Sequence, residues 1–441
     1  MEDDEPLNTT EDNNNNNNNK EALETEVAPA LISVHPSHHS VAVAVGCDLR
    51  LFNLQEGGPV TLGVESNEVF NHKESIRAIR YGAKGNVFVS AGDDKVVKVW
   101  ATDSWRCLCS VATEKKVSAV AISDNGQFVC YADKFGTVWV VELDESVENQ
   151  ALVQKKGSPL LSHYCSIITS LEFSPDGRFI ITADRDFKIR VTVFPKKPLN
   201  GAHEIQSYCL GHTEFVSCLA FVYNQDCPQG YLVSGSGDAT VRLWDFASGL
   251  LLHTCEVGSQ VGNQEANGTE SNHFAITDLC TTSDGSIFVA VQSLPGILLL
   301  SCNLSTKTLS VTRVVSIIEE DLIPTSLGTS LTSDFLWMVM GVSNLPGFNS
   351  SLARLRVISG LTKQNSESSE DHHNILEDKH VPCGEQLLQH LQGSLSIDKE
   401  VFSAAAEAVK TSMRNLLIKK QYSSERREFR KRGRNDKKGK R

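Results

Sequence analysis

The chain has 441 residues, of which 40% are hydrophobic and 22% are charged, a balance typical of a soluble globular protein. It contains no run of about 18 apolar residues, and its N-terminus is acidic, so we expect neither a membrane-spanning helix nor a secretory signal. The 12 cysteines are scattered, which favours small buried side chains in a reducing compartment over a disulfide framework.

The formal net charge of −12 combines two regions of opposite sign. Residues 426–441 contain ten Lys or Arg and two acidic residues, a net charge of +8, which leaves −20 on the rest of the chain. We expect the acidic body to repel bulk nucleic acid and the basic tail to attract it.

Residues 1–27 are acidic and polar, and they include seven consecutive asparagines from Asn13 to Asn19. A segment of this composition cannot bury enough apolar area to offset the entropy of ordering. We therefore predict that it is disordered.

From residue 28 to residue 360 one unit recurs: an apolar strand, a turn rich in Gly, Asn or Asp, a second apolar strand, a turn containing Asp, and a third strand. The third strands end at positions that are 41 to 56 residues apart, namely Phe52, Trp100, Val141, Thr192, Trp244 and Leu300. A period of about 40 to 45 residues with four strands per unit is typical of WD-repeat β-propellers. We predict an all-β propeller of seven blades, with the first, sixth and seventh degenerate.

Two of the repeats contain a matched set of four polar residues. The sets are His72, Ser90, Asp94 and Trp100 in the second blade, and His212, Ser234, Asp238 and Trp244 in the fifth. They resemble the WD-repeat tetrad, a buried hydrogen-bond chain that fixes strand register. A Ser-His-Asp hydrolase triad is the alternative, but the set occurs twice in phase with the repeat and no GxSxG motif is present.

Signatures of catalysis are absent from the sequence. It has no GxGxxG motif opening a helix after a strand, no P-loop and no HExxH motif. We predict no catalytic residue, no bound cofactor and no metal site, so the propeller is expected to bind other macromolecules. A propeller enzyme with carboxylates or histidines around its channel is an alternative.

Beyond the propeller, residues 361–396 are rich in Ser, Glu, His and Gln and predict a polar linker. Residues 397–424 predict an amphipathic helix that docks on the propeller or on a partner. Its apolar face is formed by Val401, Phe402, Ala405, Val409, Met413, Leu416 and Leu417. Residues 425–441 form a basic tail that we expect to bind RNA phosphates and to direct nuclear import. Its first basic residues are Arg426, Arg427, Arg430, Lys431, Arg432 and Arg434.

The least ordinary stretch is a turn with four charges in five residues, Asp184, Arg185, Asp186 and Lys188, within the sequence TADRDFKIR. The sequence SYCLGHTEFVS follows at residues 207–217. Together these segments resemble the WD-repeat non-catalytic subunit of tRNA (guanine-N7-)-methyltransferase, although that family often has a polar or acidic residue at the position of Phe187.

The resemblance implies a scaffold rather than an enzyme. The propeller would form a nuclear heterodimer with a Rossmann-type catalytic subunit, which binds S-adenosylmethionine and methylates N7 of a guanosine in the tRNA variable loop. The resemblance also implies that Arg185, Lys188 and Arg190 bind acidic groups of that subunit.

The remaining expected contacts are Asp186, Glu214 and Phe215 on the same edge. Two alternatives stay open: Asp186 occupies the turn position equivalent to Asp238, and Arg190 pairs within the propeller. A generic WD adaptor, such as a substrate receptor of a ubiquitin ligase, is the competing function. Trp244-Asp245 lacks the Arg that such receptors often carry two residues later.

Overall fold

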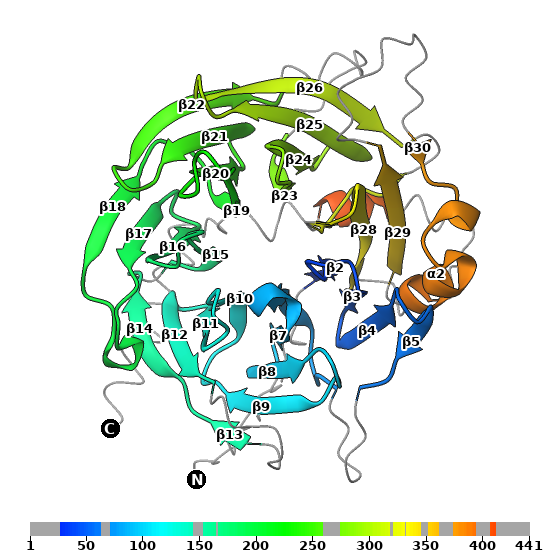
Figure 1. Cartoon of the computed structure of the whole chain (residues 1–441), viewed down its shortest axis with the longest axis horizontal. Helices are drawn as coiled ribbons and strands as arrows, with labels where there is room; N and C mark the ends of the chain where they lie inside the picture. The colour runs from blue at the N-terminus through cyan, green and yellow to red at the C-terminus, as the bar shows by residue number, and fades with distance from the viewer. Residues whose placement is uncertain are drawn as a thin grey trace, which may run out of the picture.

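Seven β-sheets are arranged as blades around a central axis, as Figure 1 shows. The computed structural model describes residues 27–62, 71–143, 153–164, 166–258, 274–317, 321–330, 332–344, 352–360, 374–393 and 406–411. The predicted all-β, seven-bladed propeller is therefore confirmed.

In each of the first three blades, four antiparallel strands follow one another from the axis outwards. Blade 1 comprises β2 (Leu31–Val34), β3 (Ser40–Val45), β4 (Asp48–Asn53) and β5 (Gly58–Val60). Blade 2 comprises β6 (Ile76–Gly82), β7 (Val87–Gly92), β8 (Val96–Ala101) and β9 (Cys107–Ala112), with β13 (Val153–Lys155) added in parallel outside β9. Blade 3 comprises β10 (Val117–Ile122), β11 (Phe128–Asp133), β12 (Thr137–Glu142) and β14 (Ser158–Ser162).

The next three blades repeat this order. Blade 4 comprises β15 (Ile168–Phe173), β16 (Phe179–Asp184), β17 (Ile189–Val193) and β18 (Ile205–Cys209). Blade 5 comprises β19 (Val216–Val222), β20 (Tyr231–Ser236), β21 (Thr240–Asp245) and β22 (Leu250–Glu256). Blade 6 comprises β23 (Ile276–Thr281), β24 (Ser286–Val291), β25 (Gly296–Asn303) and β26 (Thr308–Ser316).

Blade 7 joins the two ends of the repeat array. It comprises β27 (Ser326–Thr329), β28 (Phe335–Ser343), β29 (Leu352–Ser359) and the short β30 (Asn374–Ile375). The segment β1 (Ala28–Pro29), which precedes blade 1, pairs with the end of β28, and the Ala30 N–H donates to the Gly341 carbonyl at 2.8 Å. The N-terminal part of the propeller therefore closes the ring on its last blade.

The burial of individual strands explains why the sequence shows the repeats as apolar runs. The second strands β3, β7, β16 and β24 are buried at every residue, because neighbouring blades cover both faces of each sheet. They read as continuous apolar runs. The outermost strands β18 and β22 are largely exposed and read as polar or mixed sequence.

A helix that the sequence analysis did not predict covers the junction of blades 7 and 1. Helix α2 (Gly384–Gln392) buries Leu387, Leu388 and Leu391 there, and the Leu391 carbonyl accepts a hydrogen bond from Arg50 Nη1 at 3.0 Å. The predicted polar linker at 361–396 is thus wrong for residues 374–393, since three leucines at helical spacing pack into the core; residues 361–373 lie outside the described part.

Part of the predicted C-terminal helix packs on the propeller. Residues 406–411 are helical, and Ala406 and Val409 join a core cluster that includes Met340. The Lys410 carbonyl accepts a hydrogen bond from Gln292 Nε2 at 2.9 Å. The rest of the predicted helix, the basic tail and the N-terminal 26 residues lie outside the described part. None of the described helices is both long and apolar enough to cross a membrane.

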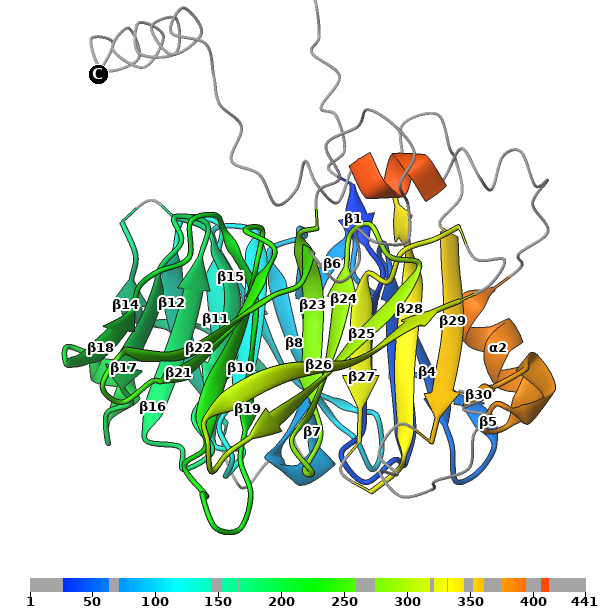
Figure 2. The ribbon, with the colours of Figure 1, turned by 90° about the horizontal axis from the view of Figure 1, so that it is seen from above.

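The two faces of the ring carry different loops. Since successive strands of a blade are antiparallel, the turns from second to third strand lie on the same face as the links from one blade to the next. We call this the upper face; it includes the turn at 185–188 and the link at 210–215. The helical residues 406–411, red in Figure 2, also lie on this face. The other turns form the lower face.

Candidate partner-binding surface

The charged turn of blade 4 is fixed by the carboxylate of Asp184. Its Oδ1 accepts hydrogen bonds from the backbone N–H groups of Asp186 at 2.8 Å and Lys188 at 3.1 Å. Phe187, between them, adopts a positive φ of 71°, which is uncommon for a residue with a side chain. The turn is therefore held in one conformation, in which Phe187 and Lys188 are exposed.

Asp184 also belongs to a third histidine network that the sequence analysis missed. His163 Nδ1 lies 2.8 Å from Asp184 Oδ2, and His163 Nε2 lies 2.7 Å from Thr182 Oγ1. In blade 5 the histidine instead meets Asp238, two positions further along the turn than Asp184. Asp186 occupies the position that matches Asp238, but in blade 4 the carboxylate that contacts the histidine is that of Asp184. Asp186 is half-buried.

Both polar sets expected from the sequence form continuous hydrogen-bond chains. In blade 5, His212 Nδ1 lies 2.9 Å from Asp238 Oδ2, while Ser234 Oγ lies 2.7 Å from His212 Nε2 and 2.8 Å from Trp244 Nε1. The same three contacts, at 2.8 to 3.1 Å, join His72, Asp94, Ser90 and Trp100 in blade 2.

The blade 5 chain is built for structure rather than catalysis. Burial lowers the pKa of His212, although the hydrogen bond from its ring to Asp238 opposes this shift. Burial disfavours ionised Asp238, but the hydrogen bond and charge of His212 hold the pKa of that carboxyl well below its usual range. Ser234 is completely buried, so no substrate reaches its hydroxyl.

Phe215 is not available to a partner, which corrects the expectation for this residue. It is only 4% exposed and lies beneath Gly237, where an added Cβ would stand 2.5 Å from the Phe215 ring. The Phe215 ring thus fills the space beneath the turn of blade 5 that contains Gly237. Glu214, its neighbour, is exposed on the upper face.

Arg190 is half-buried and bonded within the propeller. Its Nη1 donates to the Ser162 carbonyl and its Nε to Thr192 Oγ1, both at 3.1 Å. Lys98, the matching residue of blade 2, donates to the Asn71 carbonyl at 3.2 Å, and Ser162 and Asn71 both directly precede a network histidine. Arg190 therefore holds the blade link in place, as the alternative interpretation anticipated.

Exposed apolar side chains concentrate on blade 4. Ten large hydrophobic side chains are exposed among the described residues, and six of them belong to this blade. The six are Tyr164, Phe187, Leu199, Ile205, Tyr208 and Leu210. Of these six, only Phe187 stood out in the sequence, as a departure from the family pattern. Tyr164 was missed, although it directly follows the network histidine at a polar link, where an aromatic residue is unexpected.

We define the blade 4 surface as Tyr164, Phe187, Lys188, Tyr208 and Leu210. Tyr164 is 95% exposed, and Tyr208 is the cross-strand neighbour of Arg190. Exposed aromatic rings beside exposed charges are typical of protein interfaces, where they act as anchors. This surface is chemically suited to binding another protein.

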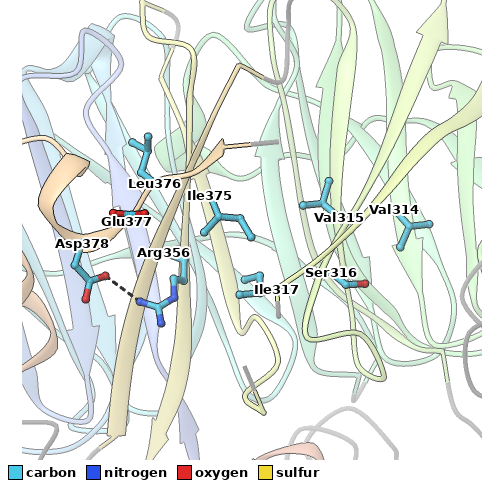
Figure 3. Close-up of a pocket in the computed structure, with 9 residues that line it drawn as sticks. All are labelled: Val314, Val315, Ser316, Ile317, Arg356, Ile375, Leu376, Glu377 and Asp378. Atoms are coloured by element: carbon cyan, nitrogen blue, oxygen red, sulfur yellow. Dashed lines mark hydrogen bonds and ion pairs between the residues drawn. The ribbon is translucent and has the colours of Figure 1, made fainter. Parts of the chain in front are cut away.

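An open groove lies elsewhere, between blades 6 and 7, with a volume of about 430 Å³ (Figure 3). Its apolar wall is formed by Val314, Val315, Ile317, Ile375 and Leu376, and an ion pair of 3.3 Å joins Arg356 to Asp378. No predicted site residue lines it. Within the described ranges, no three His, Cys, Asp or Glu side chains gather in an arrangement that could hold a metal ion.

Comparisons with known protein families and solved structures agree with the WD-repeat propeller fold. Residues 156–331 match the family model described as tRNA methyltransferase TRM82 WD40 domain, and residues 64–101 match the WD domain, G-beta repeat. The solved structure titled "Structure of U3-55K" superposes with a TM-score of 0.55 at 17% identity, covering 71% of this chain and 88% of that one. This likeness shows the propeller fold alone.

Several curated relatives share the description "tRNA (guanine-N(7)-)-methyltransferase non-catalytic subunit". The "tRNA (guanine-N(7)-)-methyltransferase non-catalytic subunit wdr4" of Xenopus laevis is 30% identical over 302 residues, covering 68% of this chain and 70% of the relative. The human protein of that name is 37% identical over 185 residues, covering 42% and 41%. The chain belongs to the family of non-catalytic subunits of tRNA (guanine-N(7)-)-methyltransferase.

Proposed function

We propose that this chain binds a Rossmann-type catalytic subunit as a heterodimer and supports N7-methylation of a guanosine in the tRNA variable loop. The catalytic subunit would hold S-adenosylmethionine, while the propeller contributes no reacting group. In this proposal the heterodimer works in the nucleus, and the basic tail, including Arg426 and Arg427, attracts the tRNA backbone.

The concentration of exposed apolar side chains on blade 4 is the observation that carries this proposal. Tyr164, Phe187, Tyr208 and Leu210 expose aromatic or aliphatic groups to water. This exposure is unfavourable in the isolated propeller and would be relieved by a bound partner. Lys188 and Glu214 add charge of both signs at the edge of this surface. Apolar anchors surrounded by charged groups fit the centre and rim of a protein interface.

Two variants test the docking surface without threatening the fold. Tyr164→Ala removes a nearly fully exposed ring, and Lys188→Glu reverses an exposed charge. We expect each to weaken binding of the catalytic subunit roughly tenfold, because interface anchors and steering charges have effects of this size. The affinity is measured by titrating the purified chain against the catalytic subunit.

Two matched controls lie on the lower face. Tyr223→Ala removes another exposed ring from blade 5, and Lys196→Glu reverses another exposed charge. Both should bind the catalytic subunit like the unsubstituted chain. Unchanged affinity in the two blade 4 variants would show that the partner docks elsewhere.

A further inference from the structure

Two histidines on the lower face each use a ring nitrogen as a hydrogen-bond acceptor. In the turn between β2 and β3, His35 Nδ1 accepts the Ser37 N–H at 3.0 Å. His38, three residues later, accepts the Trp337 Nε1–H of blade 7 at its Nε2, at 3.2 Å. A backbone amide and an indole can only donate, so both ring nitrogens must be unprotonated. The two contacts therefore require neutral histidines.

The turn that carries these rings contacts two other blades. On one side, His35 is only 7% exposed, its Nε2 lies directly against Gly85 of blade 2, and its ring centre is 5.3 Å from that of Tyr81. On the other side, the ring centre of His38 is 5.7 Å from that of Trp337 in blade 7. Blade 1 lies between blades 7 and 2, as Figure 1 shows, so the turn holds both neighbours where the ring closes.

The backbone of the turn depends on contacts made by its side chains. His38 adopts a positive φ of 58°, which is uncommon for a residue with a side chain. Its N–H donates to the His35 carbonyl at 2.8 Å, and the His35 N–H donates to the Ser40 carbonyl at 2.9 Å. A residue in this region of φ persists only where its surroundings hold it there. Loss of the Trp337 contact should therefore loosen the whole turn.

A third imidazole adjoins the first. The ring of His39 stacks on that of His35, with 4.7 Å between the ring centres and 14° between the planes. Burial and then His39 lower the pKa of both His35 and His38, although a hydrogen bond with the Gly85 backbone opposes the shift for His35. These two rings thus bind a proton less readily in the folded chain than in the unfolded chain.

The elements packed against the turn also bring other titratable groups. They are Tyr81 and Lys84 of blade 2, Glu56 in the turn between β4 and β5, and Asp334 of blade 7. Tyr81 stays neutral, because burial raises its pKa, and its hydroxyl group lies 2.9 Å from Ser40 Oγ. Burial and His39, rather than these groups, set the direction of the two histidine shifts.

We propose that His35 and His38 form an acid-sensitive clasp at the closure of the ring. When neutral, the two rings accept the Ser37 and Trp337 N–H groups and hold the turn of blade 1 against blades 2 and 7. When a ring takes up a proton from solvent, its accepting nitrogen becomes a donor that faces another donor, and the contact is lost. Mild acid therefore loosens the junction on the lower face.

The sign of the effect on stability follows from proton binding. A histidine whose pKa is lower in the folded than in the unfolded chain binds fewer protons when folded. Its contribution to stability is full above about pH 6.5, the ordinary value for histidine, and is lost as the pH falls below that value.

Side chains that keep an acceptor but cannot take up a proton test the clasp. In the double variant His35→Asn/His38→Gln, the amide oxygens can accept the same two N–H groups. The melting temperature of this variant relative to the unsubstituted chain should rise as the pH is lowered from about 7.5 to about 5. The matched control His203→Asn/His380→Gln, at two exposed positions, should show no such trend.

The indole N–H signal of Trp337 reports on His38 without a change to either histidine. Labelling with nitrogen-15 tryptophan gives one signal for each of the 5 tryptophans, and Trp337→Phe identifies the relevant one. This signal should move as the pH falls below about 6.5. The signal of Trp139, whose Nε1 donates to Asp133 Oδ2 at 2.9 Å, should keep its position.

Three results would overturn the proposal. A constant difference in melting temperature across the pH range would leave the two histidines with a merely structural role. The same trend in the control pair would mean that the effect does not arise at this turn. A Trp337 signal that does not move on acidification would refute the clasp even if the double variant fails to fold.

Discussion

Single buried hydroxyl groups hold the blades in register. Ser234 Oγ is hydrogen-bonded to both His212 Nε2 and Trp244 Nε1. It therefore connects strand β20 to strand β21 and to the link that enters blade 5. Thr182 fills the matching position in blade 4, where no tryptophan is present and the partner is His163. The hydroxyl is thus the shared element of networks that otherwise differ.

We expect Ser234→Ala to destabilise the chain by about 2 kcal/mol, since two buried polar groups lose their partner. Ser234→Thr should retain most of the stability, because the hydroxyl is kept as in Thr182. Urea denaturation checks both, with Ser248→Ala on an exposed turn as control. Equal stability of the alanine and threonine variants would contradict the role given to the hydroxyl.

Asp278, at the contact between blades 6 and 7, should make the stability of the chain depend on pH. Its Oδ2 accepts a hydrogen bond from the Leu327 N–H of blade 7 at 2.8 Å, and burial raises its pKa to about 6. A carboxyl whose pKa is higher in the folded than in the unfolded chain binds more protons when folded. Its contribution to stability is therefore full below about pH 4, the ordinary value for Asp, and is lost as the pH rises to about 6.

Asp278→Asn removes this titration. The variant loses some hydrogen bonding at every pH, which shifts its melting temperature by a constant amount. Its melting temperature relative to the unsubstituted chain should nevertheless rise between pH 4 and pH 6 and then level off. Thermal melts across this range measure the difference, and a difference that stays constant would contradict the raised pKa.

At the scale of elements, apolar patterning made the blades predictable but not the pieces that join them. The second strands are continuous apolar runs because they are covered on both sides. Helix α2 was missed because its polar flanks dominate the composition, although Leu387, Leu388 and Leu391 already had helical spacing. The His163 network was missed because Thr182 and Asp184 lie two residues apart, rather than four as in the other sets.

Helix α2 should be needed for ring closure. Leu387→Ala is expected to cost about 3 kcal/mol, because Leu387 is fully buried between the helix and blades 7 and 1. Gln389→Ala, at an exposed position of the same helix, should change the free energy of unfolding by less than about 0.5 kcal/mol. Similar values for the two variants in urea denaturation would mean that the helix does not stabilise the ring.

At the scale of the whole molecule, the candidate partner-binding surface is concentrated on blade 4. The blade 4 surface combines exposed aromatic rings with the exposed charge of Lys188. The sequence resemblance identified the charged turn of blade 4 but not its apolar neighbours. Exposure depends on how distant strands pack, and no local pattern in one sequence encodes it.

The central claim is that the chain is a scaffold for a catalytic subunit acting on tRNA. It is tested most directly by measuring N7-methylguanosine formation in tRNA by the catalytic subunit, alone and with this chain. We predict little product from either protein alone, full activity from the pair, and reduced activity with Tyr164→Ala at limiting concentrations. Equal activity of the catalytic subunit with and without this chain would contradict the account.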